Sequence, residues 1–172
     1  MLLTPIHGEP FTSGPDQGLD TNPQKLKVTV VFTSIEGTIA ALAAAAAYAN
    51  ALAAEIVICV PHVVYFRYPL ERPPVAPAYF EKLCRALIDE ANLDPYTIAI
   101  DIRYCRSQLS CLSTHLKPHS LVILGAERTW WYQREKRLAS ALGQLGHDVV
   151  FVYAPRGAAR SHSLSVTQRM LA

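Results

Sequence analysis

The sequence has little excess charge and few of the residue patterns that mark catalytic or nucleic-acid-binding proteins. The formal net charge is +2 over 172 residues, which is too small to indicate general nucleic-acid binding. The sequence shows no Walker lysine, no paired-carboxylate motif and no serine–histidine–aspartate order. We therefore expect a protein that is not an enzyme and that has no nucleic-acid partner.

Paired cysteines and a secretory leader are also missing. The four cysteines form no CxxC pair, so we expect reduced thiols. The first residues, MLLTPIHGEP, contain an early proline and no basic start, unlike a signal peptide. The alanine-rich stretch from Ile39 to Ala54 is interrupted by Tyr48 and Asn50 and is expected to be too short to cross a bilayer. These features predict a cytoplasmic protein without membrane insertion.

Metal-ligand spacing occurs once. Cys111, His115 and His119 recur every four residues, a spacing that would place them on one helix face. Pro118 should end such a helix before His119. We therefore expect no metal site.

What the sequence does contain is one domain between two tails. Half of the residues are hydrophobic, which predicts a packed core. Residues 1–24 are rich in proline and glycine and have no periodic pattern, so they are predicted to be a flexible N-terminal tail. Residues 25–154 form the expected domain, and residues 155–172 form a basic C-terminal tail.

The domain alternates between apolar runs and amphipathic segments. Strands are predicted at residues 26–34, 55–62, 97–104, 120–125 and 148–153, and helices at 38–54, 79–92, 107–117 and 134–145. The third run alternates apolar and polar residues, which places it nearer a sheet edge. The helix that ends at Leu145, before Gly146, is expected to turn Leu138, Leu142 and Leu145 inward. The alternation predicts an α/β fold with an open five-stranded parallel sheet and helices on both faces.

A proline-broken loop is predicted at residues 63–77. Its aromatic residues, Tyr65, Phe66 and Tyr68, could recognise a partner or cover a pocket. We expect them to pack against the domain.

Open parallel sheets bind ligands beyond the carboxyl ends of their strands, where the strand order reverses. If the first and fourth strands flank that reversal, Thr33, Ser34, Gly125 and Ala126 line the crevice. Val60, near the end of the second strand, joins this candidate set.

The order and lengths of these elements resemble the universal stress protein family. KVTVVFTS is similar to its first strand, EIVICVPHVV to its second, SLVILGAER to its fourth and HDVVFVYA to its last. The resemblance implies a sheet of order 3-2-1-4-5, a small cytoplasmic protein, dimers through the last strand and, in many members, ATP binding.

The chain departs from that family at the positions that hold ATP. Thr33 stands where the family has an aspartate, and Arg128 stands where a glycine should follow Gly125. The later pair of glycine with serine or threonine is absent. Because glycine lets backbone N–H groups approach phosphate closely, these changes predict weak or absent ATP binding.

A second similarity is to the universal-stress domain of potassium-responsive sensor kinases (the KdpD type). The segments GAERTWWYQREKR and LGHDVVFVY carry this resemblance. It implies a signalling or ion-homeostasis role.

A basic and aromatic cluster follows the fourth strand. Arg128, Arg134, Lys136 and Arg137, with Trp130 and Trp131, could clamp an anion and stack on a base. The alternative is a solvated helix start with the tryptophans folded over the crevice as a lid. Arg128, Trp131 and Lys136 complete the candidate ligand-binding set.

Two functions remain open. One is a sensor or regulatory protein that holds a nucleotide or another small anion between the first and fourth strands. The other is a ligand-free adaptor that acts through dimerisation and contacts with a signalling partner. Because the last strand, DVVFVY, is apolar and lies at a sheet edge, we expect a homodimer through Val150, Val152 and Tyr153.

Overall fold

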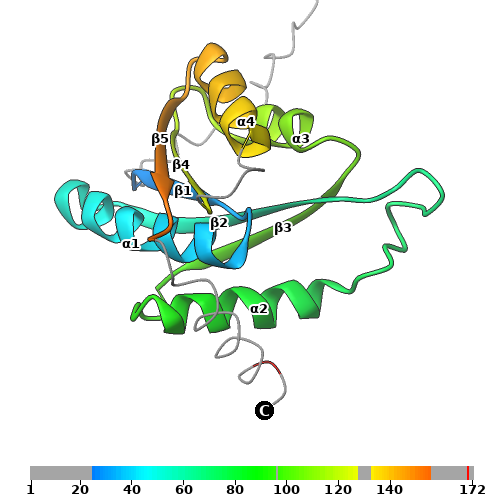
Figure 1. Ribbon diagram of the computed structural model, residues 1–172, viewed down its shortest axis with the longest axis horizontal. Helices are drawn as coiled ribbons and strands as arrows, with labels where there is room; N and C mark the ends of the chain where they lie inside the picture. Colours follow the sequence, from blue (N-terminus) through cyan, green and yellow to red (C-terminus); the bar gives the residue numbers. More distant parts are fainter. Residues whose placement is uncertain (1–24, 96, 128–132, 156–169, 171–172) are drawn as a thin grey trace, which may run out of the picture.

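The computed structural model describes residues 25–95, 97–127, 133–155 and 170 (Figure 1). Strands and helices alternate through the domain. In chain order they are β1 (Lys27–Val31), α1 (Ile35–Leu52), β2 (Glu55–Val63), α2 (Pro77–Glu90), β3 (Ala99–Cys105), α3 (Gln108–His115), β4 (Leu121–Ala126), α4 (Gln133–Gln144) and β5 (Asp148–Tyr153).

The five strands form one parallel sheet in the order β3-β2-β1-β4-β5. This confirms the predicted α/β class and the predicted strand order. The central strand β1 pairs with β2 on one side and with β4 on the other, so the strand order reverses at β1. The carboxyl ends of β1, β2 and β4 therefore meet at one edge of the sheet.

The helices cover both faces of the sheet, as predicted. Helices α1 and α2 lie on one face, and α3 and α4 lie on the other (Figure 1). Alternate residues of each strand enter the two layers: Val28 and Val30 pack under α1 and α2, whereas Val31 packs under α3 and α4. Met170, in the C-terminal tail, packs against the first of these layers.

Helix α1 begins earlier than its sequence indicates. It starts at Ile35 instead of near Thr38, because the Ser34 hydroxyl accepts a hydrogen bond of 3.1 Å from the Gly37 N–H and caps the helix. The helix has 18 residues and is long and apolar enough to cross a membrane by length and composition, so the predicted shortness does not hold. Leu42 is fully buried within the first layer, so the inner face of α1 contributes to the core.

The end of α4 differs from the prediction in one respect. Gly146 has φ of 87° and ends the helix as expected. Leu138 and Leu142 are buried, but Leu145 lies beyond the last helical residue and is 53% exposed. The prediction that Leu145 turns inward is therefore wrong, because the helix ends before it.

Candidate functional site

Thr33 connects the ends of the two strands that were expected to flank the crevice. Its hydroxyl donates a hydrogen bond of 2.6 Å to the carbonyl oxygen of Gly125, and its backbone N–H donates to the Thr38 hydroxyl over 3.2 Å. Thr38 is fully buried. These bonds fix the β1–α1 turn against the end of β4, so Thr33 has a structural role at the sheet edge.

Gly125 serves close packing between α1 and β4. A β-carbon built on Gly125 would meet the backbone of Gly37, with the Gly37 carbonyl carbon at 2.5 Å. A β-carbon on Gly37 would lie 2.6 Å from the Gly125 carbonyl oxygen. Neither obstacle is a flexible side chain that can move aside. The two glycines therefore let the first turn of α1 lie directly on the end of β4.

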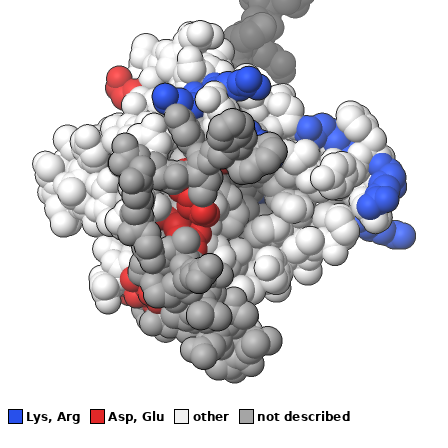
Figure 2. Space-filling view, in the orientation of Figure 1, with Lys and Arg blue, Asp and Glu red and all other residues white. Residues whose placement is uncertain are grey.

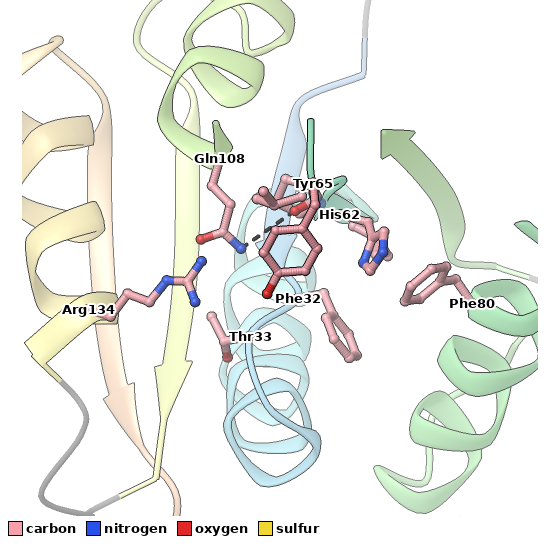
Figure 3. A pocket seen from close by; sticks show the side chains of 10 residues that line it. Phe32, Thr33, His62, Tyr65, Phe80, Gln108 and Arg134 are labelled. Atoms are coloured by element: carbon pink, nitrogen blue, oxygen red, sulfur yellow. Dashed lines mark hydrogen bonds between the residues drawn. The ribbon is translucent and has the colours of Figure 1, made fainter. Parts of the chain in front are cut away.

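An open cleft lies next to this contact, over the ends of β1 and β2. Its volume is about 350 Å³. Side chains from β2, α2, α3 and α4 and from the connecting segments after β1 and β2 surround it (Figure 3). The residues that line it are Phe32, Thr33, Val60, Pro61, His62, Val63, Tyr65, Phe80, Gln108 and Arg134.

Two polar groups of the cleft, Gln108 and Arg134, come from the starts of two helices. Gln108 is the first residue of α3, and its amide donates to the Pro61 carbonyl oxygen over 3.5 Å. Arg134 lies in the first turn of α4 and brings the positive charge. The described residues that line the cleft include no carboxylate. The cleft can therefore attract an anion.

Aromatic rings form the opposite wall. The rings of His62 and Phe80 have centroids 4.7 Å apart, and Tyr104 contacts His62 edge-on at 5.8 Å. Burial lowers the pKa of His62. The imidazole is therefore neutral at neutral pH, and this wall offers ring surface and hydrogen bonding without charge.

The predicted candidate residues are distributed over several roles. Thr33 and Val60 line the cleft, Ser34 caps α1, and Gly125 and Ala126 are buried at the end of β4. Lys136 is exposed on α4 and is not among the residues that line the cleft. Arg128 and Trp131 lie outside the described residues.

Sequence reasoning missed most of the cleft wall. His62 and Phe80 carry no local signal, because a ring in an apolar run is normally core. The loop aromatics did carry a signal. Tyr65 is 72% and Phe66 is 86% exposed, so the expectation that both pack against the domain is wrong.

Cys111 and His115 on α3 contact each other within the helix. His115 Nδ1 lies 2.8 Å from the Cys111 carbonyl oxygen, to which it can donate. The four cysteines are free and buried. Within the described residues, no group of three potential ligands could hold a metal ion.

Comparisons with protein-family models, curated proteins and solved structures find no match for this chain. The class of protein is therefore defined by the fold and the cleft without a known relative. The chain is an α/β protein with an open parallel sheet of the nucleotide-binding type.

Proposed function

We propose that this chain is a small sensor or regulatory protein, similar to universal stress proteins, that binds a small organic anion in the cleft over β1 and β2. The observation that carries the proposal is the pairing of one cation, Arg134, with uncharged aromatic walls at the carboxyl edge of a parallel sheet. A role in cytoplasmic stress or ion-homeostasis signalling, without catalysis, accords with the sequence resemblance.

The proposed ligand is a nucleotide or a related anion, bound through side chains. The Gly125 carbonyl already accepts from Thr33, and α1 occupies the space beside the Gly125 α-carbon. A backbone cradle for a triphosphate is therefore not supported at this glycine. A guanidinium instead binds a phosphate through paired hydrogen bonds. We expect a nucleoside monophosphate or a cyclic dinucleotide to bind more tightly than ATP.

Titration calorimetry with AMP, ATP and cyclic dinucleotides tests this function. Arg134→Ala should weaken binding by about 1–3 kcal/mol, the range for a hydrogen bond to a charged group. Arg137→Ala is the matched control, because Arg137 is exposed on the same helix and does not line the cleft. Tight magnesium-dependent ATP binding that ignores Arg134→Ala would contradict the proposal.

The sequence prediction for the segment after β4 can be tested in the same titrations. Arg128→Ala and Trp131→Ala should each cost about 1–3 kcal/mol if these residues clamp and stack on the ligand. Wild-type affinity in both variants would restrict the site to the described cleft.

An adaptor that acts through dimerisation is the second candidate. Strand β5 is one of the two outer strands of the sheet. Its residues Val150, Phe151 and Val152 are only half-buried. An apolar edge strand favours pairing with a second copy. Light scattering at micromolar concentration should give the mass of a homodimer. A monomer, combined with no response to any nucleotide, would remove both candidates.

A further inference from the structure

A long loop, residues 64–76, joins β2 to α2 and carries Tyr65 to the cleft. Figure 2 shows lysine and arginine side chains over this loop and, separately, over the α3–α4 side of the molecule. The loop has no helix or strand of its own. Tyr65 lines the cleft while 72% of its surface stays exposed, so its own packing contributes little to the position of the loop.

Arg106 holds the start of this loop. Its Nη1 donates to the carbonyl oxygens of Val64 and Tyr65 at 2.9 and 2.7 Å, and its Nη2 donates to the carbonyl oxygen of Tyr68 at 2.9 Å. The guanidinium carbon also lies 5.0 Å from the centre of the Phe66 ring. One side chain thus fixes the backbone on both sides of the exposed aromatic pair.

Two further bonds connect this clamp to the domain. The Val64 N–H donates to the Cys105 carbonyl oxygen over 2.8 Å, next to Arg106 itself. At the far end of the loop, the Tyr104 hydroxyl donates to the Val75 carbonyl oxygen over 2.7 Å. The end of β3 therefore anchors the loop at both ends, and Arg106 sets the conformation between Val64 and Tyr68.

We infer that the cleft selects anions that carry a planar aromatic ring, and that Arg106 is the positioning residue that keeps Tyr65 at the cleft mouth to contact that ring. This inference rests on the proposed function, since Arg134 supplies the anion contact. Figure 3 shows the two elements of the recognition together: Arg134 reaches in from α4, and Tyr65 lies in front of the cleft. A ring stacked on an aromatic side chain adds affinity that a bare phosphate cannot gain.

The first test compares AMP with ribose 5-phosphate, which carries the same phosphate without the base. The wild-type protein should bind AMP about tenfold more tightly, the factor expected of one stacked base. Tyr65→Leu should remove most of this preference and leave the affinity for ribose 5-phosphate within about twofold. Tyr48→Leu is the control, because Tyr48 is an exposed tyrosine on α1 and does not line the cleft.

The second test addresses Arg106 through two substitutions. Arg106→Ala removes the clamp, and Arg106→Lys keeps the charge but loses the planar fork that reaches three carbonyl groups. Both variants should lose the preference for AMP although Tyr65 is present. Both should also be cut faster by trypsin at the Arg67–Tyr68 bond, without any ligand, because the loop is released.

The outcomes separate the inference from the proposed function. Equal affinity for both phosphates in the wild-type protein, with binding that still depends on Arg134, would overturn ring selection alone. The positioning role would be overturned if Arg106→Lys preferred AMP as strongly as the wild-type protein does, or if trypsin cut the Arg106 variants no faster than the wild-type protein. If neither phosphate binds, the proposed function and ring selection both fall, and the cleavage rates still decide whether Arg106 holds the loop.

Discussion

Replacing Gly125 by alanine tests the close contact between α1 and β4. The new methyl group would point at the backbone of Gly37, with the carbonyl carbon only 2.5 Å away. Non-bonded carbon atoms in proteins lie about 3.5–4.0 Å apart at their optimal separation. Helix α1 and strand β4 would therefore have to separate by roughly 1 Å or more. No side-chain rotation can relieve the clash, because the backbone fixes the position of the methyl group and the atoms that it meets are backbone atoms of Gly37.

The separation would have two costs. Overpacking of this kind destabilises a protein by typically about 1–3 kcal/mol. A shift of α1 would also stretch the 2.6 Å bond from Thr33 to the Gly125 carbonyl, and a weakened hydrogen bond adds about 0.5–1.5 kcal/mol. We therefore expect Gly125→Ala to lower the free energy of unfolding by about 3 kcal/mol, or the melting temperature by about 6–12 °C.

Urea unfolding followed by circular dichroism measures this loss, and the chain offers a matched control. Gly143 lies in α4, and a β-carbon there would meet nothing within 4 Å. Gly143→Ala should therefore stabilise the protein by about 0.5–1 kcal/mol, because alanine is the better helix former. A loss below about 1 kcal/mol for Gly125→Ala would refute the close contact, since overpacking costs at least that much.

Three further predictions concern titration and the N-terminal tail. Burial raises the pKa of the Cys59 and Cys84 thiols from 9.0 to about 12. Because these thiols ionise at lower pH in the unfolded chain, the free energy of unfolding should fall as pH rises from 9 towards 12. If alanine variants of both cysteines show the same pH dependence, the two thiols are not its source. Burial lowers the pKa of His62, so the free energy of unfolding should fall as pH drops below 6.5, and His62→Phe should flatten that limb; equal acid limbs would show that His62 does not contribute. Removing residues 1–24 should leave the melting temperature nearly unchanged, since this segment has no apolar stripe to bury; a drop of more than a few degrees would show that it packs on the domain.

The fold could be predicted because each of its elements has a strong local signal. Val28, Val30 and Val31 lie in a continuous apolar run, which is typical of a strand buried on both faces. Leu83 and Leu87 keep the spacing of one helix face and are both buried. The alternation of such segments restricts the chain to a parallel sheet with right-handed crossovers. The strand order itself came from the family resemblance.

The candidate site was harder to predict, because each of its residue types can serve more than one role and the fold determines which role it takes. A glycine at a strand end, such as Gly125, is typical of a ligand loop. Position 125 nevertheless requires glycine because it contacts Gly37, which is distant in sequence. Ser34 suits a ligand as well as a helix cap, and the structure uses it as the cap. The loop that carries Tyr65 is held by Arg106, and no sequence pattern links a strand-end arginine to three carbonyl groups of a loop.

The contact between Gly37 and Gly125 also explains why a binding function at this edge should depend on side chains. A phosphate cradle needs a glycine whose surroundings are open to the ligand. Here the first turn of α1 occupies that space, and Thr33 occupies the carbonyl group. Once Gly125 serves packing, a second glycine in the following segment would have no cradle to complete, so the sequence is free to carry another residue at position 128.

The charge of the cleft then limits the ligand. Among the described residues that line it, Arg134 is the one permanent cation, and His62 is kept neutral by its burial. A single guanidinium matches one phosphate or carboxylate through two parallel hydrogen bonds, whereas a triphosphate would leave most of its charge unmatched. The rings of His62, Tyr65 and Phe80 offer the remaining surface. An anion with one charged group and one planar ring therefore uses this cleft more completely than ATP does.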